Sequence, residues 1–278
     1  MSIRQRIGLG EVLPSAARRF WRIDGIDQSG LLAMELFTTV LPLTILGFSA
    51  AKGFAADVSV GEIFIRQLRL DGQAAEQVRS AFGSMSGTQT WWTVMGLAGF
   101  LIWGVPMALT VSKMYAAAWQ RPELPTMTRL WRGALWFALY LPTMFVSERL
   151  GMAGRASEIG EWLPFTISLL PPLLFWSLTP VLLLPGVPHR RGDLLRYGLV
   201  GVLVNAVILR LAGRLVFPQL LAGWEGFGPI GVAMTLLTWS LVLGVGWVLT
   251  ACLTGVMVDS TAPLEADEEP VTPLMRQP

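Results

Sequence analysis

Charged side chains inside long apolar segments constrain this chain more than any other sequence feature. Arg210 and Arg214 lie in the apolar segment 197–217, and Glu35 lies in the apolar segment 31–51. Each segment has the ~20 residues that a helix needs to cross a bilayer. A charge at such a depth costs roughly 3 kcal/mol, so it usually faces protein or a water-filled cavity. The pattern predicts a membrane bundle with polar residues in its interior.

The composition also indicates a membrane protein. The mean hydropathy is +0.55, and charged residues make up only 14% of the chain, whereas a soluble domain carries about 25%. We predict an all-α fold, a polytopic membrane helical bundle with six transmembrane helices. The expected spans are residues 29–51, 91–118, 130–146, 162–184, 194–217 and 229–258.

The membrane domain, residues 29–258, lies between a basic leader and an acidic tail. The leader, residues 1–28, contains an expected interfacial helix near 13–23 with its arginines toward anionic lipid; a disordered leader is the alternative. The first outer loop, residues 52–90, has apolar residues at helical spacing, which predicts two short amphipathic helices on either side of Gly72. Residues 259–278 are rich in proline and acids and are predicted to form a disordered cytoplasmic tail.

The distribution of basic residues predicts the orientation. With the N-terminus in the cytoplasm, 13 Lys and Arg residues flank the inner ends of the spans and 6 flank the outer ends. Such a bias favours both termini in the cytoplasm. Trp119 and Trp131 fall at inner ends and are expected in an aromatic belt at the membrane surface.

The polar residues of the spans predict a substrate-binding site, made of Arg210, Glu35, Lys113, Thr38 and Asn205. Arg210 would hold an anionic headgroup, because a guanidinium suits phosphate and carboxylate. Glu35 shares a helix face with Thr38, and Lys113 shares one with Thr110. Glu35 lies about 9 Å from the inner edge and Arg210 about 24 Å from it. Lys113 is therefore a better partner for Glu35 than Arg210 is.

Each of these charges also has a purely structural interpretation. Arg214, and less readily Arg210, can extend to the outer headgroups. Glu35 can form a structural pair or be protonated, and Lys113 can be an ordinary interfacial anchor. A second face of the fifth span, predicted to pack closely against a neighbouring helix, carries Gly198, Gly201 and Asn205.

Sequence signatures of enzymes are absent from the chain. The only histidine, His189, is part of a basic loop with two arginines, and the single cysteine, Cys252, excludes an internal disulfide and a Cys-cluster metal site. No Gly-rich phosphate loop, paired His ligands or nucleophile elbow occurs. We predict a protein that is not an enzyme, with no catalytic residue, metal or cofactor, and with no nucleic-acid partner.

Several short motifs, in the same order and at similar spacing, resemble the YihY/BrkB family of bacterial inner-membrane proteins. The residues that carry the resemblance are Leu41–Pro42, Ser112–Tyr115, Leu184–Pro185, Arg190–Arg191, Leu194–Gly198, Phe227–Gly231, Trp239 and Gly255. The resemblance covers roughly residues 20–258. It implies six transmembrane helices, both termini inside, and a location in the bacterial inner membrane. Glu35 and Met257 differ from the family pattern, and no catalytic residue is carried over.

The resemblance implies a transport role, and the polar interior is compatible with one. We expect a protein that translocates a lipid or other anionic amphiphile, with membrane lipids as its partners. The alternative is a non-transporting scaffold or envelope assembly factor that binds its partners through residues 59–83 and the acidic tail. The family was once labelled ribonuclease BN. A membrane-bound nuclease is nevertheless disfavoured for this chain, because a metal-dependent nuclease needs several convergent acidic residues.

Overall fold

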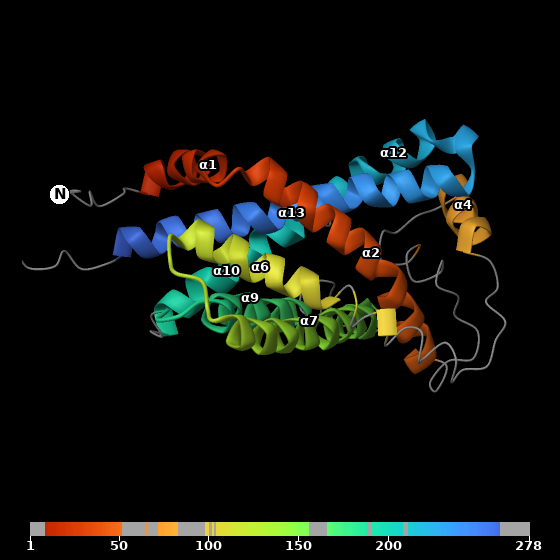
Figure 1. Cartoon of the computed structure of the whole chain (residues 1–278). Coiled ribbons are helices and arrows are strands. Elements are labelled where there is room, and N and C mark those ends of the chain that lie inside the picture. The colour runs from red at the N-terminus through yellow and green to blue at the C-terminus, as the bar shows by residue number, and fades with distance from the viewer. Residues whose placement is uncertain are drawn as a thin grey trace, which may run out of the picture.

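The computed structural model describes residues 9–51, 65, 72–82, 98–99, 102, 104–155, 166–187, 191–207 and 211–261. Every regular element in these ranges is a helix, which confirms the all-α class for the described part of the chain (Figure 1). The elements are η1 (Leu9–Glu11), α1 (Val12–Arg22), α2 (Gly25–Ala51), α4 (Gly72–Phe82), α6 (Val105–Trp119), α7 (Thr126–Arg155), α9 (Leu170–Leu183), α10 (Arg191–Val207), α11 (Gly213–Leu215), α12 (Phe217–Gly223), η4 (Glu225–Phe227) and α13 (Pro229–Thr261).

The longest helix, α13, runs through the middle of the molecule and packs against α1, α2, α6 and α10 (Figure 1). It begins at Pro229, whose fixed φ and missing N–H suit the first helical turn. The closest approach to α2 is at Gly244, where an added Cβ would lie 2.6 Å from the carbonyl oxygen of Ser29. Glycine at this position therefore lets the two backbones touch.

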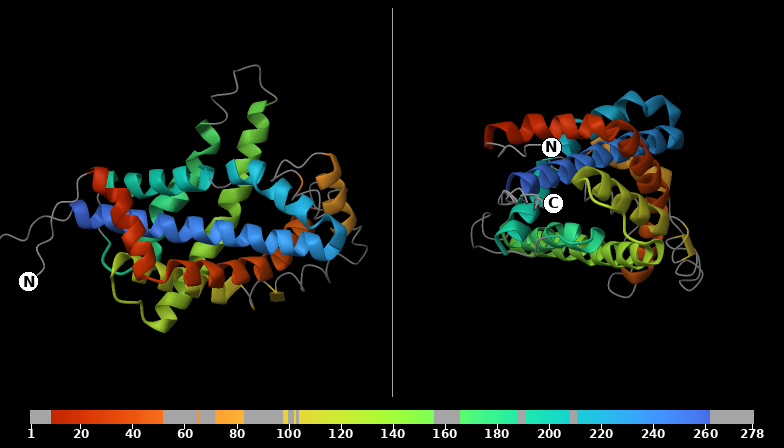
Figure 2. Two further views of the ribbon diagram at one scale, coloured as in Figure 1. Left: turned by 90° about the horizontal axis from the view of Figure 1, so that it is seen from above. Right: turned by 60° about the vertical axis from the view of Figure 1, so that its left-hand side comes forward.

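A second group of helices, α7, α9 and α10, packs along one side of α13. α7 and α9 run side by side and are steeply inclined to α13 (Figure 2, left). Gly198 and Gly201 of α10 face α9, where a Cβ on Gly198 would lie 2.6 Å from the Leu173 carbonyl oxygen and one on Gly201 would collide with Trp176. The predicted close packing of this small-residue face is confirmed.

Buried aromatic side chains join α7, α9 and α13. Trp136 has no exposed surface, and its ring packs against Tyr140, Phe175 and Trp247 with centroid separations of 5.3 to 6.0 Å. Its indole Nε1 donates a hydrogen bond to Thr179 Oγ1 at 3.0 Å. This bond satisfies the polar atom of an otherwise apolar core.

Two segments of the described chain are long and apolar enough to cross a membrane, Thr166–Leu183 and Ile230–Asp259. They correspond to the expected fourth and sixth spans. Residues 91–97, 100, 101 and 103 of the second expected span lie outside the described residues, and so do the side chains of residues 40–51 in the first. In the fifth, residues 194–207 lie in α10 and residues 211–215 are also helical, while 208–210 lie outside the described residues. A turn at Val216 separates this stretch from α12, which begins at Phe217 with Pro218 in its first turn.

Other expected boundaries are confirmed or corrected by the helices. α1 lies where the leader helix is expected, and α4 matches the second of the two loop helices; the first lies outside the described residues apart from Ile65. α7 extends well beyond both ends of the expected third span, 130–146. α13 continues to Thr261, so the expected tail beginning at residue 259 starts too early: Asp259 is helical and takes part in packing.

Candidate functional site

Glu35 connects two helices through its carboxylate. It lies in α2, which packs beside α6, and its side chain is half-buried. Thr110 of α6 donates a hydrogen bond from its Oγ1 to Glu35 Oε1 at 2.7 Å. The other oxygen, Oε2, is buried and has no hydrogen-bond partner among the described residues. One carboxylate oxygen is therefore used in joining the helices, and the other is not.

Lys113 lies one helical turn beyond Thr110 and is exposed. Side chains three residues apart on a helix are neighbours, and the charge of Lys113 acts on Glu35. Within the described structure, however, Lys113 forms no ion pair with Glu35 or with any other residue. We call the group of Glu35, Thr110 and Lys113 the α2–α6 seam.

The position of the seam can be given relative to the C-terminal end of α6. Trp119 is the last residue of α6, so Thr110 lies about 13 Å and Lys113 about 9 Å from that end along the helix axis. The sequence-based prediction that Glu35 and Lys113 match in depth agrees with this placement. Thr110, the residue that contacts Glu35 directly, is missing from the predicted site, although its i−3 relation to Lys113 places it on the same face.

The other predicted site residues do not join the seam. Thr38 Oγ1 donates to Met34 O at 2.9 Å, a bond within its own helix. Asn205 Nδ2 likewise donates to the Gly201 carbonyl oxygen of α10 at 2.7 Å. These two side chains satisfy their polar groups locally, as such residues often do inside helices. The structure therefore gives no support to a five-residue site that includes them.

The two arginines of the expected fifth span have separate outcomes. Arg210 lies outside the described residues, so its predicted contact with a ligand stays a prediction. Arg214 lies in α11 and is exposed. That position is compatible with the structural interpretation, in which its side chain extends toward a polar surface.

A separate groove of about 280 Å³ lies between α7 and α9. Its lining is almost wholly apolar and includes two prolines, Pro142 and Pro171. The one hydroxyl in the lining, that of Thr143, donates to the Leu139 carbonyl oxygen of its own helix. The groove thus offers no charged group to a ligand, unlike the α2–α6 seam.

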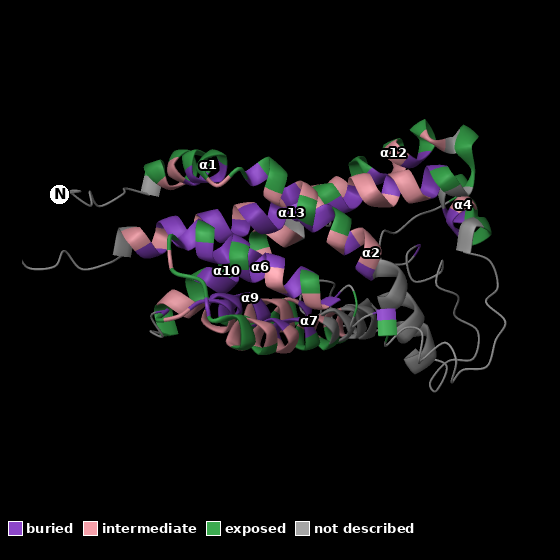
Figure 3. Ribbon diagram, viewed as in Figure 1, coloured by how far each residue is buried: buried purple, intermediate pink, exposed green. Residues whose placement is uncertain are grey.

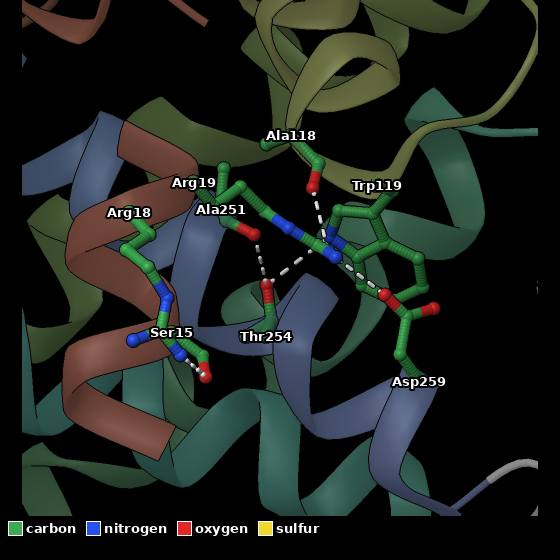
Figure 4. Close-up of polar contacts among 8 residues, drawn as sticks. All are labelled: Ser15, Arg18, Arg19, Ala118, Trp119, Ala251, Thr254 and Asp259. Atoms are coloured by element: carbon green, nitrogen blue, oxygen red, sulfur yellow. Dashed lines mark hydrogen bonds and ion pairs between the residues drawn. The ribbon is translucent and has the colours of Figure 1, made fainter. Parts of the chain in front are cut away.

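Arg19 forms a buried junction at the end of the bundle where α1 begins and α13 ends (Figure 4). It donates from Nη1 to the Ala118 carbonyl oxygen of α6 at 2.9 Å and from Nη2 to Asp259 Oδ2 of α13 at 2.5 Å. Only 7% of the residue is exposed. The prediction that the leader arginines face lipid is therefore wrong for Arg19, which lies on the same stripe of α1 as the buried Ala16 and Phe20.

Two neighbouring residues complete the junction. Trp119 donates from Nε1 to Thr254 Oγ1 at 3.2 Å and packs edge-on against Tyr197. Trp119 is 4% exposed, which contradicts its expected place in an aromatic belt, whereas Trp131 is 67% exposed. Gly255 leaves room for the junction, because a Cβ there would lie 2.9 Å from Arg19 Nη1. The junction ties α1, α6 and α13 together.

Clusters suited to metal binding do not occur in the described part of the chain: no three His, Cys, Asp or Glu side chains converge there. Cys252 is buried in α13. No protein family, curated protein or solved structure that was compared with this chain matches it.

Proposed function

We propose that this chain is a multi-pass inner-membrane protein of the YihY/BrkB type that translocates a lipid or other anionic amphiphile. In this proposal α2, α7, α9, α10, α13 and α6 with the residues before it supply six spans. α2, α7 and α13 have 27, 30 and 33 residues. At 1.5 Å per residue they are roughly 40 to 50 Å long, enough to cross a ~30 Å hydrocarbon layer even when tilted.

Exposed apolar side chains support a lipid environment. Only 39% of the membrane-length segment Thr166–Leu183 is buried, whereas the core helix of a soluble protein is mostly buried. Exposed and buried residues alternate along the helices (Figure 3), and among the exposed ones leucines recur every four residues along α9 and α10. These residues are Leu170, Leu174 and Leu178 of α9 and Leu195, Leu199 and Leu203 of α10. Acyl chains would cover such stripes, since water would not favour them.

The observation that carries the transport proposal is the α2–α6 seam. Lys113 is exposed, and α2 carries two exposed apolar side chains, Leu31 and Met34, in the turn before Glu35. An amphiphile needs this combination, a charged point for its headgroup and an apolar surface for its tail. A lysine ammonium carries three donors and suits a phosphate or carboxylate as a point charge.

The arrangement of the chain ends supports the proposed topology. α1 begins and α13 ends at the same end of the bundle, where Arg19 and Asp259 form an ion pair. Both termini would then lie on one side of the membrane, and the bias of basic residues in the sequence favours the cytoplasm.

The test is translocation of acyl-labelled lipids in proteoliposomes that contain the full chain. We expect faster translocation than in protein-free vesicles, and slower translocation with Lys113→Gln, Glu35→Gln or Arg210→Gln. Arg214→Gln is the matched control, because it removes an exposed charge that is not part of the seam. Rates equal to those of protein-free vesicles would contradict the proposal and favour the scaffold alternative.

A further inference from the structure

We propose that the α2–α6 seam recognises a headgroup that carries both a primary ammonium and a phosphate, the phosphoethanolamine type. The inference rests on the proposed function in one respect, that a lipid reaches the seam from the membrane. It goes further by naming the chemistry that the seam selects. Glu35 would take the ammonium and Lys113 the phosphate.

The first argument is that two opposite charges lie close together without pairing. Lys113 acts electrostatically on Glu35, but they form no ion pair in the described structure. Thr110 holds one oxygen of the Glu35 carboxylate at 2.7 Å. Because that bond fixes the carboxylate on α6, Glu35 does not extend to Lys113. Both charges therefore stay available to a ligand with charges of its own.

The second argument is the unused oxygen of Glu35. Oε2 has no hydrogen-bond partner among the described residues, although it is buried. An unsatisfied charged oxygen carries a free-energy cost that an incoming donor relieves. The side chain as a whole is only half-buried, so the carboxylate lies near the surface of the bundle. A primary ammonium supplies the donor and the compensating charge together.

The third argument is the orientation of the two groups. Glu35 meets α6 at Thr110, about 13 Å from the end of the helix, and Lys113 lies about 4 Å nearer that end. A headgroup seated on both would direct its phosphate toward the end of the bundle where α6 finishes. A phosphoglycerol headgroup offers Glu35 only neutral hydroxyl donors without a positive charge, and a quaternary choline ammonium has no N–H to donate. The seam therefore distinguishes these three headgroups by chemistry alone.

The test is native mass spectrometry of the full chain, released from detergent with equal amounts of phosphatidylethanolamine, phosphatidylcholine and phosphatidylglycerol that share the same acyl chains. We expect wild-type protein to retain phosphatidylethanolamine about tenfold better than the other two, since one charge-assisted hydrogen bond accounts for at least that factor. Glu35→Gln should abolish this preference, and Lys113→Gln should weaken the binding of phosphatidylethanolamine and phosphatidylglycerol alike. Glu76→Gln is the control, because Glu76 is an exposed carboxylate of α4 that pairs with Arg79.

Equal retention of the three lipids by wild-type protein would overturn the inference, and so would a preference that survives in Glu35→Gln. If that variant does not fold, stepwise N-methylation of the ethanolamine headgroup tests wild-type protein alone, and retention must fall as N–H donors are removed. The outcomes also separate the two proposals. A headgroup preference without translocation overturns the transport function only, and translocation without a preference overturns this inference only.

Discussion

Replacing Arg19 should destabilise the protein far more than replacing its neighbour Arg18. Arg19 has a side chain 9% exposed and bonds both to the Ala118 carbonyl oxygen and to Asp259, whose side chain is 29% exposed. Breaking a buried ion pair by removing one partner costs about 3 to 5 kcal/mol. Because Asp259 keeps some contact with solvent, we expect the lower end, about 3 kcal/mol for Arg19→Ala. Arg18 is exposed and bonds to Ser15, so Arg18→Ala should stay within about 0.5 kcal/mol.

The assay is denaturant-induced unfolding of the full chain in detergent micelles, followed as a double-mutant cycle. Asp259→Asn keeps an acceptor and should cost about 1 to 2 kcal/mol. The Arg19→Ala, Asp259→Asn double variant should be little worse than Arg19→Ala alone, because the pair is already broken. Fully additive effects, or equal losses for Arg18→Ala and Arg19→Ala, would refute the reasoning.

Three further predictions follow from packing and hydrogen bonds. Gly198→Ala should cost about 1 to 3 kcal/mol of stability, because its Cβ collides with α9, whereas Gly192→Ala, in open space on the same helix, should be neutral in the same unfolding assay. Thr179→Val should cost about 1 to 3 kcal/mol, because it leaves the indole N–H of buried Trp136 without its acceptor. Thr110→Val should free Glu35 to pair with Lys113, so phosphatidylethanolamine retention should fall by mass spectrometry while the fold, followed by circular dichroism, is kept.

The sequence predicted those features of the fold that depend on the residue pattern of a single helix. Gly198 and Gly201 lie on one face by spacing alone, and close packing there requires only that some helix covers them. The depth match of Glu35 and Lys113 follows from the rise per residue along two helices, since α2 begins and α6 ends on the same side of the bundle. Neither prediction needed the identity of the contacting residue, and for that reason Thr110 was missed.

Features that depend on contacts between distant segments could not be predicted in the same way. Trp119 looks like an interfacial tryptophan until Thr254 and Tyr197, far along the chain, come into contact with it. For Arg19 a signal did exist: it falls on the apolar stripe of α1 with Ala16 and Phe20, the face that packs inward.

Basic residues that flank the expected spans therefore have two roles. Some bond to backbone carbonyl oxygens and others are exposed charges that indicate orientation, and a count of charges does not separate them. Arg19 donates to a carbonyl oxygen at the end of α6, and Arg121 donates to the Gly186 carbonyl oxygen beyond the end of α9 at 2.9 Å. The Ala118 carbonyl is one of the last four of α6, which a helix leaves without partners, and Gly186 lies in the turn that follows α9. Such arginines would be needed at these positions whichever way the protein faced. The orientation argument rests more securely on the exposed arginines, such as Arg18 and Arg22.

The junction and the seam act on the same helix, and this connects stability with the proposed function. α6 is fixed at its end through Ala118, by Arg19, and eight residues earlier through Thr110, which bonds to Glu35. Ala118 lies five residues beyond Lys113 and Thr110 three residues before it, so Lys113 is held between two fixed points on a single rigid helix. Arg19 is not a residue of the seam, but it thus helps to fix the position of the Lys113 ammonium. A variant at Arg19 that still folds should accordingly weaken phosphate binding at Lys113 without changing any residue of the seam.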